Sequence, residues 1–182
     1  GTAIGDVTAG RYLSFGILAA LLERESSGKG QWVDTSLLEA LIAVMDFQSA
    51  AWLVDKKVPQ QAGNDHPKSI PTGAFKTSDG FINIGSGDQI RWERLARALD
   101  LAHLIDQPAY KTGEDRSENR ASLNVALGAV IESKTMQHWV DILNAEGVPC
   151  GPIYAVDQVF ADPQVKHQGI AAKLAHPQLG DI

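Results

Sequence analysis

The apolar pattern of the N-terminal part of the chain predicts a long helix that ends in a turn. Apolar residues recur at helical spacing over residues 7–24, and Asp6 stands where the N-cap is expected. Residues 26–30 supply the glycines and small polar residues that end a helix. A short strand is expected to follow at residues 31–34.

A capping signal predicts the second helix. Ser36 and Glu39 have the spacing at which a hydroxyl and a carboxylate satisfy free backbone amides, and an apolar run follows to Val54. Periodicity then disappears over residues 55–71, which we interpret as a long connector. Connectors of this length inside compact proteins are often functional, so residues 63–67 are of interest.

A hairpin signal begins at Thr72. Residues 72–77 and 81–84 flank Ser78-Asp79-Gly80, and Asp-Gly between two such runs predicts a two-stranded antiparallel unit. Helical periodicity then predicts three helices, at residues 88–99, 117–132 and 136–146, the last capped by Thr135 and ended by Gly147.

The C-terminal part is expected to be mostly extended. Residues 148–156 contain Pro149 and Pro152, which confine a strand to edge positions. Short helical turns are expected at residues 157–161 and 163–167. The order of elements indicates an α/β protein with two structural units, divided between residues 55 and 70.

Composition narrows the classes of partner. The 182 residues are 44% hydrophobic, which is enough to build a core, and the net charge of −6 comes without a long run of one sign. Nucleic acid and anionic membranes are therefore poor partners, because both bind clustered Lys and Arg. The longest apolar stretch, residues 15–22, is short of the roughly 20 residues that span a bilayer.

The cysteine count and the first residues of the chain indicate where the protein is located and whether the chain is part of a longer one. Cys150 is the only cysteine, so no intramolecular disulfide or cysteine-based metal cage can form, and a cytoplasmic location is expected. The chain opens on Gly1 without an initiator Met or a signal pattern. We expect that it begins inside a longer protein.

Asp6 is the sharpest candidate for chemistry. It follows Gly5 and opens a helix, where backbone N–H groups are free and negative charge is stabilised. The alternative from local pattern is that Asp6 is simply a cap, since Asp is common at that position. Local pattern does not decide between the two.

Several segments, in their order and spacing, carry a resemblance to a known family. They are Gly5-Asp6 with Ala9-Gly10, residues 16–21, Arg24 with residues 28–37, residues 77–80, residues 107–110, Arg116 with Asn119-Arg120, residues 147–152 and residues 162–165. Together they resemble the family III CoA-transferases of the CaiB/BaiF type, which include formyl-CoA transferase and α-methylacyl-CoA racemase relatives.

The resemblance implies a fold and an assembly. It implies a Rossmann-like large domain built from both chain ends, a small domain with a hairpin and helices between them, and an interlocked homodimer. Residues 1–55 would end the first half of the large domain, 56–71 would link, 72–156 would form the small domain, and 157–182 would return. Family contacts to CoA come mainly from upstream, so the fragment alone is expected to be inactive or weakly active.

The resemblance also implies an activity and its site. Asp6 would be the nucleophile that moves CoA between an acyl-CoA and a carboxylic acid, with CoA a substrate and no tightly bound cofactor. Racemase relatives use the same aspartate as an acid or base. A third possibility is a non-catalytic oligomerisation module. Gly63, Asn64 and His66 match the position of a glycine-rich loop that covers the active site, although this run has a single glycine.

The remaining residues with chemically reactive side chains or glycine motifs are interpreted as having structural roles. The remaining histidines are scattered without ligand spacing, so no metal site is expected. Gly85-Ser86-Gly87 lacks the Lys-Ser/Thr ending of a phosphate loop and is interpreted as a turn. Cys150 has no neighbouring base and is interpreted as a small hydrophobic residue.

Overall fold

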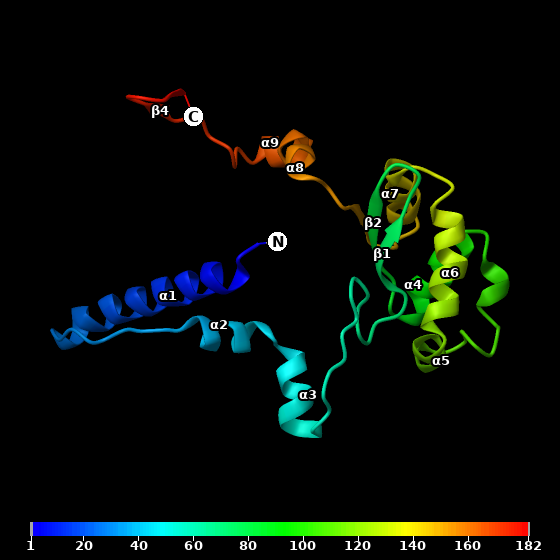
Figure 1. The fold of residues 1–182 in the computed structure, drawn as a ribbon, viewed down its shortest axis with the longest axis horizontal. Helices are drawn as coiled ribbons and strands as arrows, with labels where there is room; N and C mark the ends of the chain where they lie inside the picture. The colour runs from blue at the N-terminus through cyan, green and yellow to red at the C-terminus, as the bar shows by residue number, and fades with distance from the viewer. Residues whose placement is uncertain (1, 182) are drawn as a thin grey trace. The chain divides into compact units, whose positions relative to one another are not determined.

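The computed structural model describes residues 2–181, and the chain divides into two compact units, Gly1–Gln61 and Ala62–Ile182 (Figure 1). We call these unit 1 and unit 2. Unit 1 is helical, and unit 2 combines helices with two small antiparallel sheets. The expected α/β class is therefore confirmed.

Helix α1 (Ile4–Ser27) opens unit 1 and starts earlier than predicted. Its N-cap is Ala3, which makes no side-chain capping bond, so Asp6 lies in the first helical turn and the expected N-cap role was wrong. The first turn also includes Gly5, which is less favourable than alanine in a helix by about 1 kcal/mol. The helix ends at Gly28, which has φ 70° and donates its N–H to the carbonyl of Arg24 at 2.8 Å.

Residues 28–36 contain no helix or strand, so the expected strand at residues 31–34 was wrong. A strand needs a hydrogen-bonded neighbour, and none pairs with this segment among residues 2–181. Trp32 in this segment is 88% exposed. The capping box predicted at Ser36 is confirmed, since the Ser36 amide and the Glu39 carboxylate are 2.9 Å apart and the Glu39 amide donates to Ser36 Oγ at 3.1 Å.

The single helix expected up to Val54 is instead two, α2 (Leu37–Val44) and α3 (Phe47–Asp55). The break lies at Asp46, whose φ of 45° and ψ of −123° are not helical. No single described helix is both long and apolar enough to cross a membrane; α2 and α3 meet that test only as a pair, and they are bent by 83°.

The main sheet of unit 2 contains the predicted hairpin and a third strand. Strands β1 (Thr72–Lys76) and β2 (Phe81–Gly85) pair antiparallel, with Ala74 opposite Asn83. Strand β3 (Cys150–Pro152) pairs antiparallel with the other side of β2. The order β1-β2-β3 places β3 at an edge, which suits Pro152 in the strand and Pro149 directly before it.

Helices cover one face of this sheet. They are α4 (Gln89–Ala98), α5 (Gly113–Glu118), α6 (Arg120–Ile131) and α7 (Met136–Ala145), with a 3-10 turn at Ala102–Leu104. The helices predicted at 88–99 and 136–146 are confirmed, whereas the one at 117–132 is divided by Asn119. A capping box between Thr112 and Asp115 starts the additional helix, α5.

The core of the protein lies in unit 2. Its fully buried apolar side chains are Ile82, Ile84, Trp92, Leu95, Leu123, Leu127, Ile131, Leu143 and Val148. Beyond the core, α8 (Val156–Ala161) and α9 (Pro163–His167) confirm the two predicted helical turns. Strands β4 (Ala175–His176) and β5 (Gly180–Asp181) form a second, two-stranded sheet.

Candidate functional site

The carboxylate of Asp6 is open to solvent at the start of α1. The side chain is exposed, and no described residue forms an ion pair or hydrogen bond with it. In the first turn of a helix the backbone N–H groups lack intrahelical partners, so this end of α1 stabilises negative charge. Asp6 is therefore accessible to a reactant, next to donors that suit an oxyanion.

Close packing with α2 and the segment before it holds the start of α1. A Cβ added to Gly5 would lie 3.5 Å from the side chain of Leu41, and one added to Gly16 would lie 2.7 Å from Val33 Cγ1. Ala9 on α1 and Ala40 on α2 are the buried apolar residues of the described part of unit 1. Small residues thus let the two elements approach and fix the direction of α1.

Most of the large apolar residues of α1 are exposed. They are Ile4, Val7, Tyr12, Phe15, Ile17, Leu18, Leu21 and Leu22. A helix with apolar residues on most of its surface is normally buried in a larger protein. Unit 1 therefore carries Asp6 on a helix whose surface suits further protein contacts.

The predicted loop residues Gly63, Asn64 and His66 lie together at the start of unit 2. Gly63 has φ 59° and no atom within 4 Å of an added Cβ, so it is an open turn that favours glycine. Asn64 is exposed. His66 is half-buried, and its Nδ1 accepts the backbone N–H groups of Lys68 and Ser69 at 3.2 and 3.0 Å.

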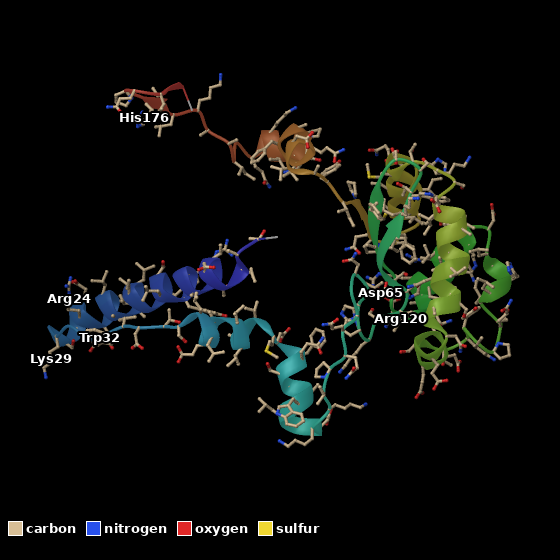
Figure 2. The ribbon with its side chains drawn as sticks, in the orientation of Figure 1. Arg24, Lys29, Trp32, Asp65, Arg120 and His176 are labelled. Carbon is tan, nitrogen blue, oxygen red and sulfur yellow. The ribbon has the colours of Figure 1, made fainter. Side chains whose placement is uncertain are left out.

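Side chains of α6 fasten this loop from Asp65 onward (Figure 2). Arg120 Nη2 donates to the carbonyls of His66 and Pro67 at 2.9 and 3.3 Å. Asn124 Nδ2 donates to the Asp65 carboxylate at 3.2 Å. The loop is therefore anchored on one side of the exposed Gly63 turn.

Arg116 of α5 anchors the end of the same loop. It is 1% exposed, and it donates from Nε to the carbonyl of Ile70 at 3.1 Å and from Nη1 to the carbonyl of Tyr110 at 3.0 Å. Its guanidinium carbon lies 5.4 Å from the ring centroid of Trp92. Burial lowers the pKa of Arg116 from its ordinary value, and the nearby carboxylates of Asp115 and Asp88 oppose that shift.

The sequence did not predict that Arg116, Arg120 and Asn124 together anchor the loop. Arg116 and Arg120 were present as parts of the family resemblance, but nothing in the local pattern indicated that they bind a loop about fifty residues away. Asn124 carried no signal. These bonds depend on long-range packing, which periodicity does not reveal.

The other chemical candidates gain no support from geometry. No group of three or more His, Cys, Asp or Glu side chains within residues 2–181 is arranged to hold a metal ion. Partial burial raises the pKa of the Cys150 thiol to about 11, which disfavours the nucleophilic thiolate. Ser86 lies buried beside Pro71 and donates to its carbonyl, so the segment 85–87 packs against the loop end.

Known proteins resemble the chain over its full length. A family model described as CoA-transferase family III matches residues 1–182. The chain is 35% identical to human succinyl-CoA:glutarate CoA-transferase, covering 100% of this chain and 42% of that protein. It is 32% identical to succinate–glutarate CoA-transferase of Agrobacterium fabrum, covering 96% of this chain and 44% of the relative.

A solved structure agrees with these relatives. The chain is similar to a CaiB/BaiF family protein from Brucella suis, with a TM-score of 0.81, 32% identity, and coverage of 96% of this chain and 46% of that one. The fold is thus that of the CaiB/BaiF class. The chain belongs to CoA-transferase family III. It spans less than half the length of the relatives it matches.

Proposed function

We propose that the protein containing this chain transfers CoA from an acyl-CoA to a carboxylic acid, with Asp6 as the nucleophile. The observation that carries the proposal is the exposed carboxylate of Asp6 in the first turn of α1, which has no ion-pair or hydrogen-bond partner within residues 2–181. Family membership supports it. A carboxylate suits this reaction because its anhydride is about as activated as the thioester from which it forms.

The proposed reaction consists of two acyl exchanges at Asp6. The carboxylate attacks the thioester carbonyl, the C–S bond breaks, and a mixed anhydride and CoA thiolate form. The thiolate attacks the aspartyl carbonyl, which releases the donor acid and leaves an aspartyl-CoA thioester. The acceptor carboxylate then attacks this thioester, which expels CoA thiolate and forms a second mixed anhydride. The thiolate attacks the acceptor carbonyl of this anhydride, which gives the acceptor acyl-CoA and regenerates the Asp6 carboxylate. Each addition puts negative charge on an oxygen, which the N–H groups at the start of α1 would stabilise.

The proposal extends to substrates and assembly. The two named relatives carry succinyl-CoA, succinate or glutarate in their names, which supports short dicarboxylic acids as donor and acceptor. The exposed apolar residues of α1 support a homodimer, interlocked as the family resemblance implies. The single cysteine supports a cytoplasmic location.

The loop is proposed to contribute substrate contacts through Gly63, Asn64 and His66. The open Gly63 turn and the exposed Asn64 amide support contact with a ligand. The anchoring of residues 65–70 by α5 and α6 supports a contact surface that is already in place before substrate binds.

Mass spectrometry of the complete protein tests the proposal. After incubation with succinyl-CoA, hydroxylamine should trap the activated acyl group as a hydroxamate on the peptide that contains Asp6. Asp6→Ala should abolish the adduct and transfer, while Asp55→Asn, a change at an exposed aspartate at the end of α3, should retain both. Full transfer activity in Asp6→Ala would overturn the nucleophile assignment and favour a non-catalytic role for this region.

A second measurement separates transfer from racemisation. A racemase would introduce solvent deuterium at the carbon next to the thioester carbonyl of a 2-methylacyl-CoA without any acceptor acid. The transferase proposal expects CoA exchange that depends on the acceptor and ping-pong kinetics. Deuterium uptake without CoA exchange would replace the transferase proposal with the racemase alternative.

A further inference from the structure

The two sides of Asp6 on α1 differ. Successive residues of an α-helix are about 100° apart around the axis, so Gly5 and Ala9 lie on one side of Asp6, and Ala3 and Gly10 lie on the other. The first side packs on α2, because Ala9 is 8% exposed and a Cβ added to Gly5 would lie 3.5 Å from a leucine side chain of α2. Within unit 1, the second side is therefore the open approach to the Asp6 carboxylate.

The open side carries almost no side-chain atoms. Ala3 and Gly10 are both exposed. A Cβ added to Gly10 would meet no atom within 4 Å among residues 2–181. Helical side chains lean towards the N-terminus, so a side chain at position 10 would extend over the residue one turn earlier, which is Asp6. Glycine at this position thus leaves the space beside the carboxylate empty.

Neither the backbone nor the packing of unit 1 requires glycine at position 10. Gly10 is not among the glycines with a positive φ, and it lies inside a helix of 24 residues, where alanine is the better helix former. Open space alone does not distinguish it, because Gly128 in α6 has open space as well. The difference is that Gly10 lies one turn from the proposed nucleophile.

We propose that Gly10 is a positioning residue that keeps the Asp6 carboxylate accessible to the acyl group. For attack, the acyl carbon must come within bonding distance of a carboxylate oxygen, which brings the neighbouring atoms of the acyl chain against the surface of α1. A hydrogen atom at position 10 leaves room for them, whereas a side chain would compete for the same space. This inference rests on the proposed reaction at Asp6, and it concerns unit 1 alone.

Two substitutions of increasing size test the proposal in the complete protein. Gly10→Ala and Gly10→Leu introduce good helix formers, so the thermal unfolding midpoint should stay the same or rise. With succinyl-CoA and glutarate as substrates, kcat/KM should fall by about tenfold for Gly10→Ala and by more than about 100-fold for Gly10→Leu. Gly128→Ala, the same change at the other open helical glycine, is the matched control and should keep the wild-type kcat/KM.

A single-turnover measurement assigns the effect to the first acyl exchange. At saturating succinyl-CoA, the rate of hydroxamate formation on the peptide that contains Asp6 should fall from wild type to Gly10→Ala and again to Gly10→Leu. The pH dependence of this rate should not change, because neither substitution alters a charge. An unchanged rate in both variants would overturn the proposal.

Stability separates access to Asp6 from a packing role of Gly10. If Gly10 were needed for close packing in the complete protein, both variants should lose thermal stability together with activity, and the larger side chain should lose more. That result would overturn the proposal. Retained stability with a loss of rate that grows with side-chain size supports it.

The nucleophile and the positioning residue fail in distinguishable ways. If Asp6→Ala abolishes the adduct while Gly10→Leu reacts at the wild-type rate, the proposed reaction stands and the inference about Gly10 is wrong. If Asp6→Ala retains full transfer, the nucleophile assignment is wrong, and the inference about Gly10 fails with it.

Discussion

Replacing Arg116 with methionine tests how the loop is held in unit 2. The substitution keeps a long aliphatic side chain but removes the donors that satisfy the carbonyls of Ile70 and Tyr110. Leaving a buried acceptor unsatisfied costs about 1–3 kcal/mol each. Because methionine also avoids the cost of burying a cation, we expect a net loss of about 2–4 kcal/mol.

Urea unfolding of the chain measures this loss. The midpoint should fall by roughly 1–2 M at an m value of about 2 kcal/mol/M. The urea midpoint of Arg116→Lys should lie between those of the wild type and Arg116→Met, because the lysine ammonium keeps the charge but lacks the planar guanidinium geometry. Arg97→Met is the matched control, since Arg97 is exposed and pairs with Glu93 at the surface, where such pairs contribute about 0–1 kcal/mol. Equal stability of Arg116→Met and Arg97→Met would refute the reasoning.

Three further predictions concern single sites in unit 2. Arg120→Ala should accelerate hydrogen exchange at the Ser69 amide several-fold, because the loop loses two of its anchors; unchanged exchange would contradict the anchoring role. Gly87→Ala should destabilise the fold by about 1–3 kcal/mol, because the new Cβ would lie 1.5 Å from Ser69 Oγ. Gly128→Ala is the control in the same urea assay. It should stabilise the fold by about 0.5–1 kcal/mol, because the new Cβ in α6 meets open space. Because desolvation raises the pKa of the Cys150 thiol to about 11, iodoacetamide should label this thiol slowly at pH 8 and faster as the pH rises towards 11. The stability that this thiol contributes to the fold should decline over the same pH range, because the thiol of the unfolded chain ionises first. Rapid labelling at pH 8 would contradict the raised pKa.

Local signals were sufficient for the elements whose ends are set by nearby residues. The Asp79-Gly80 turn gave the hairpin, the Ser36 capping box gave the start of α2, and Thr135 gave the start of α7. The Thr112 capping box was equally visible in the sequence but was missed, so α5 was not predicted. In each case one or two hydrogen bonds within four residues fix the boundary.

The errors fall where distant contacts or unusual backbone angles decide the structure. The strand expected at residues 31–34 has no pairing partner in the described chain, and periodicity cannot supply one. Asp46 breaks the second helix at a positive φ, although neither glycine nor proline marks the position. The candidate site divides in the same way. Asp6 could be named from the family resemblance of the sequence, whereas Arg120 binds the carbonyl of His66, 54 positions away, a contact that no sequence pattern indicated.

The distribution of buried side chains differs between unit 1 and unit 2. Unit 2 has its own core, and its loop is anchored by Arg116, Arg120 and Asn124 without any residue of unit 1. Unit 1 exposes most of the apolar surface of the helix that carries Asp6. Changes in the loop anchors should therefore alter substrate affinity while Asp6 keeps its setting, so they should raise KM before they lower the yield of the trapped Asp6 adduct. Changes that disturb the protein contacts of α1 should first lower the yield of the trapped Asp6 adduct, because the direction of the helix determines where the carboxylate meets the thioester.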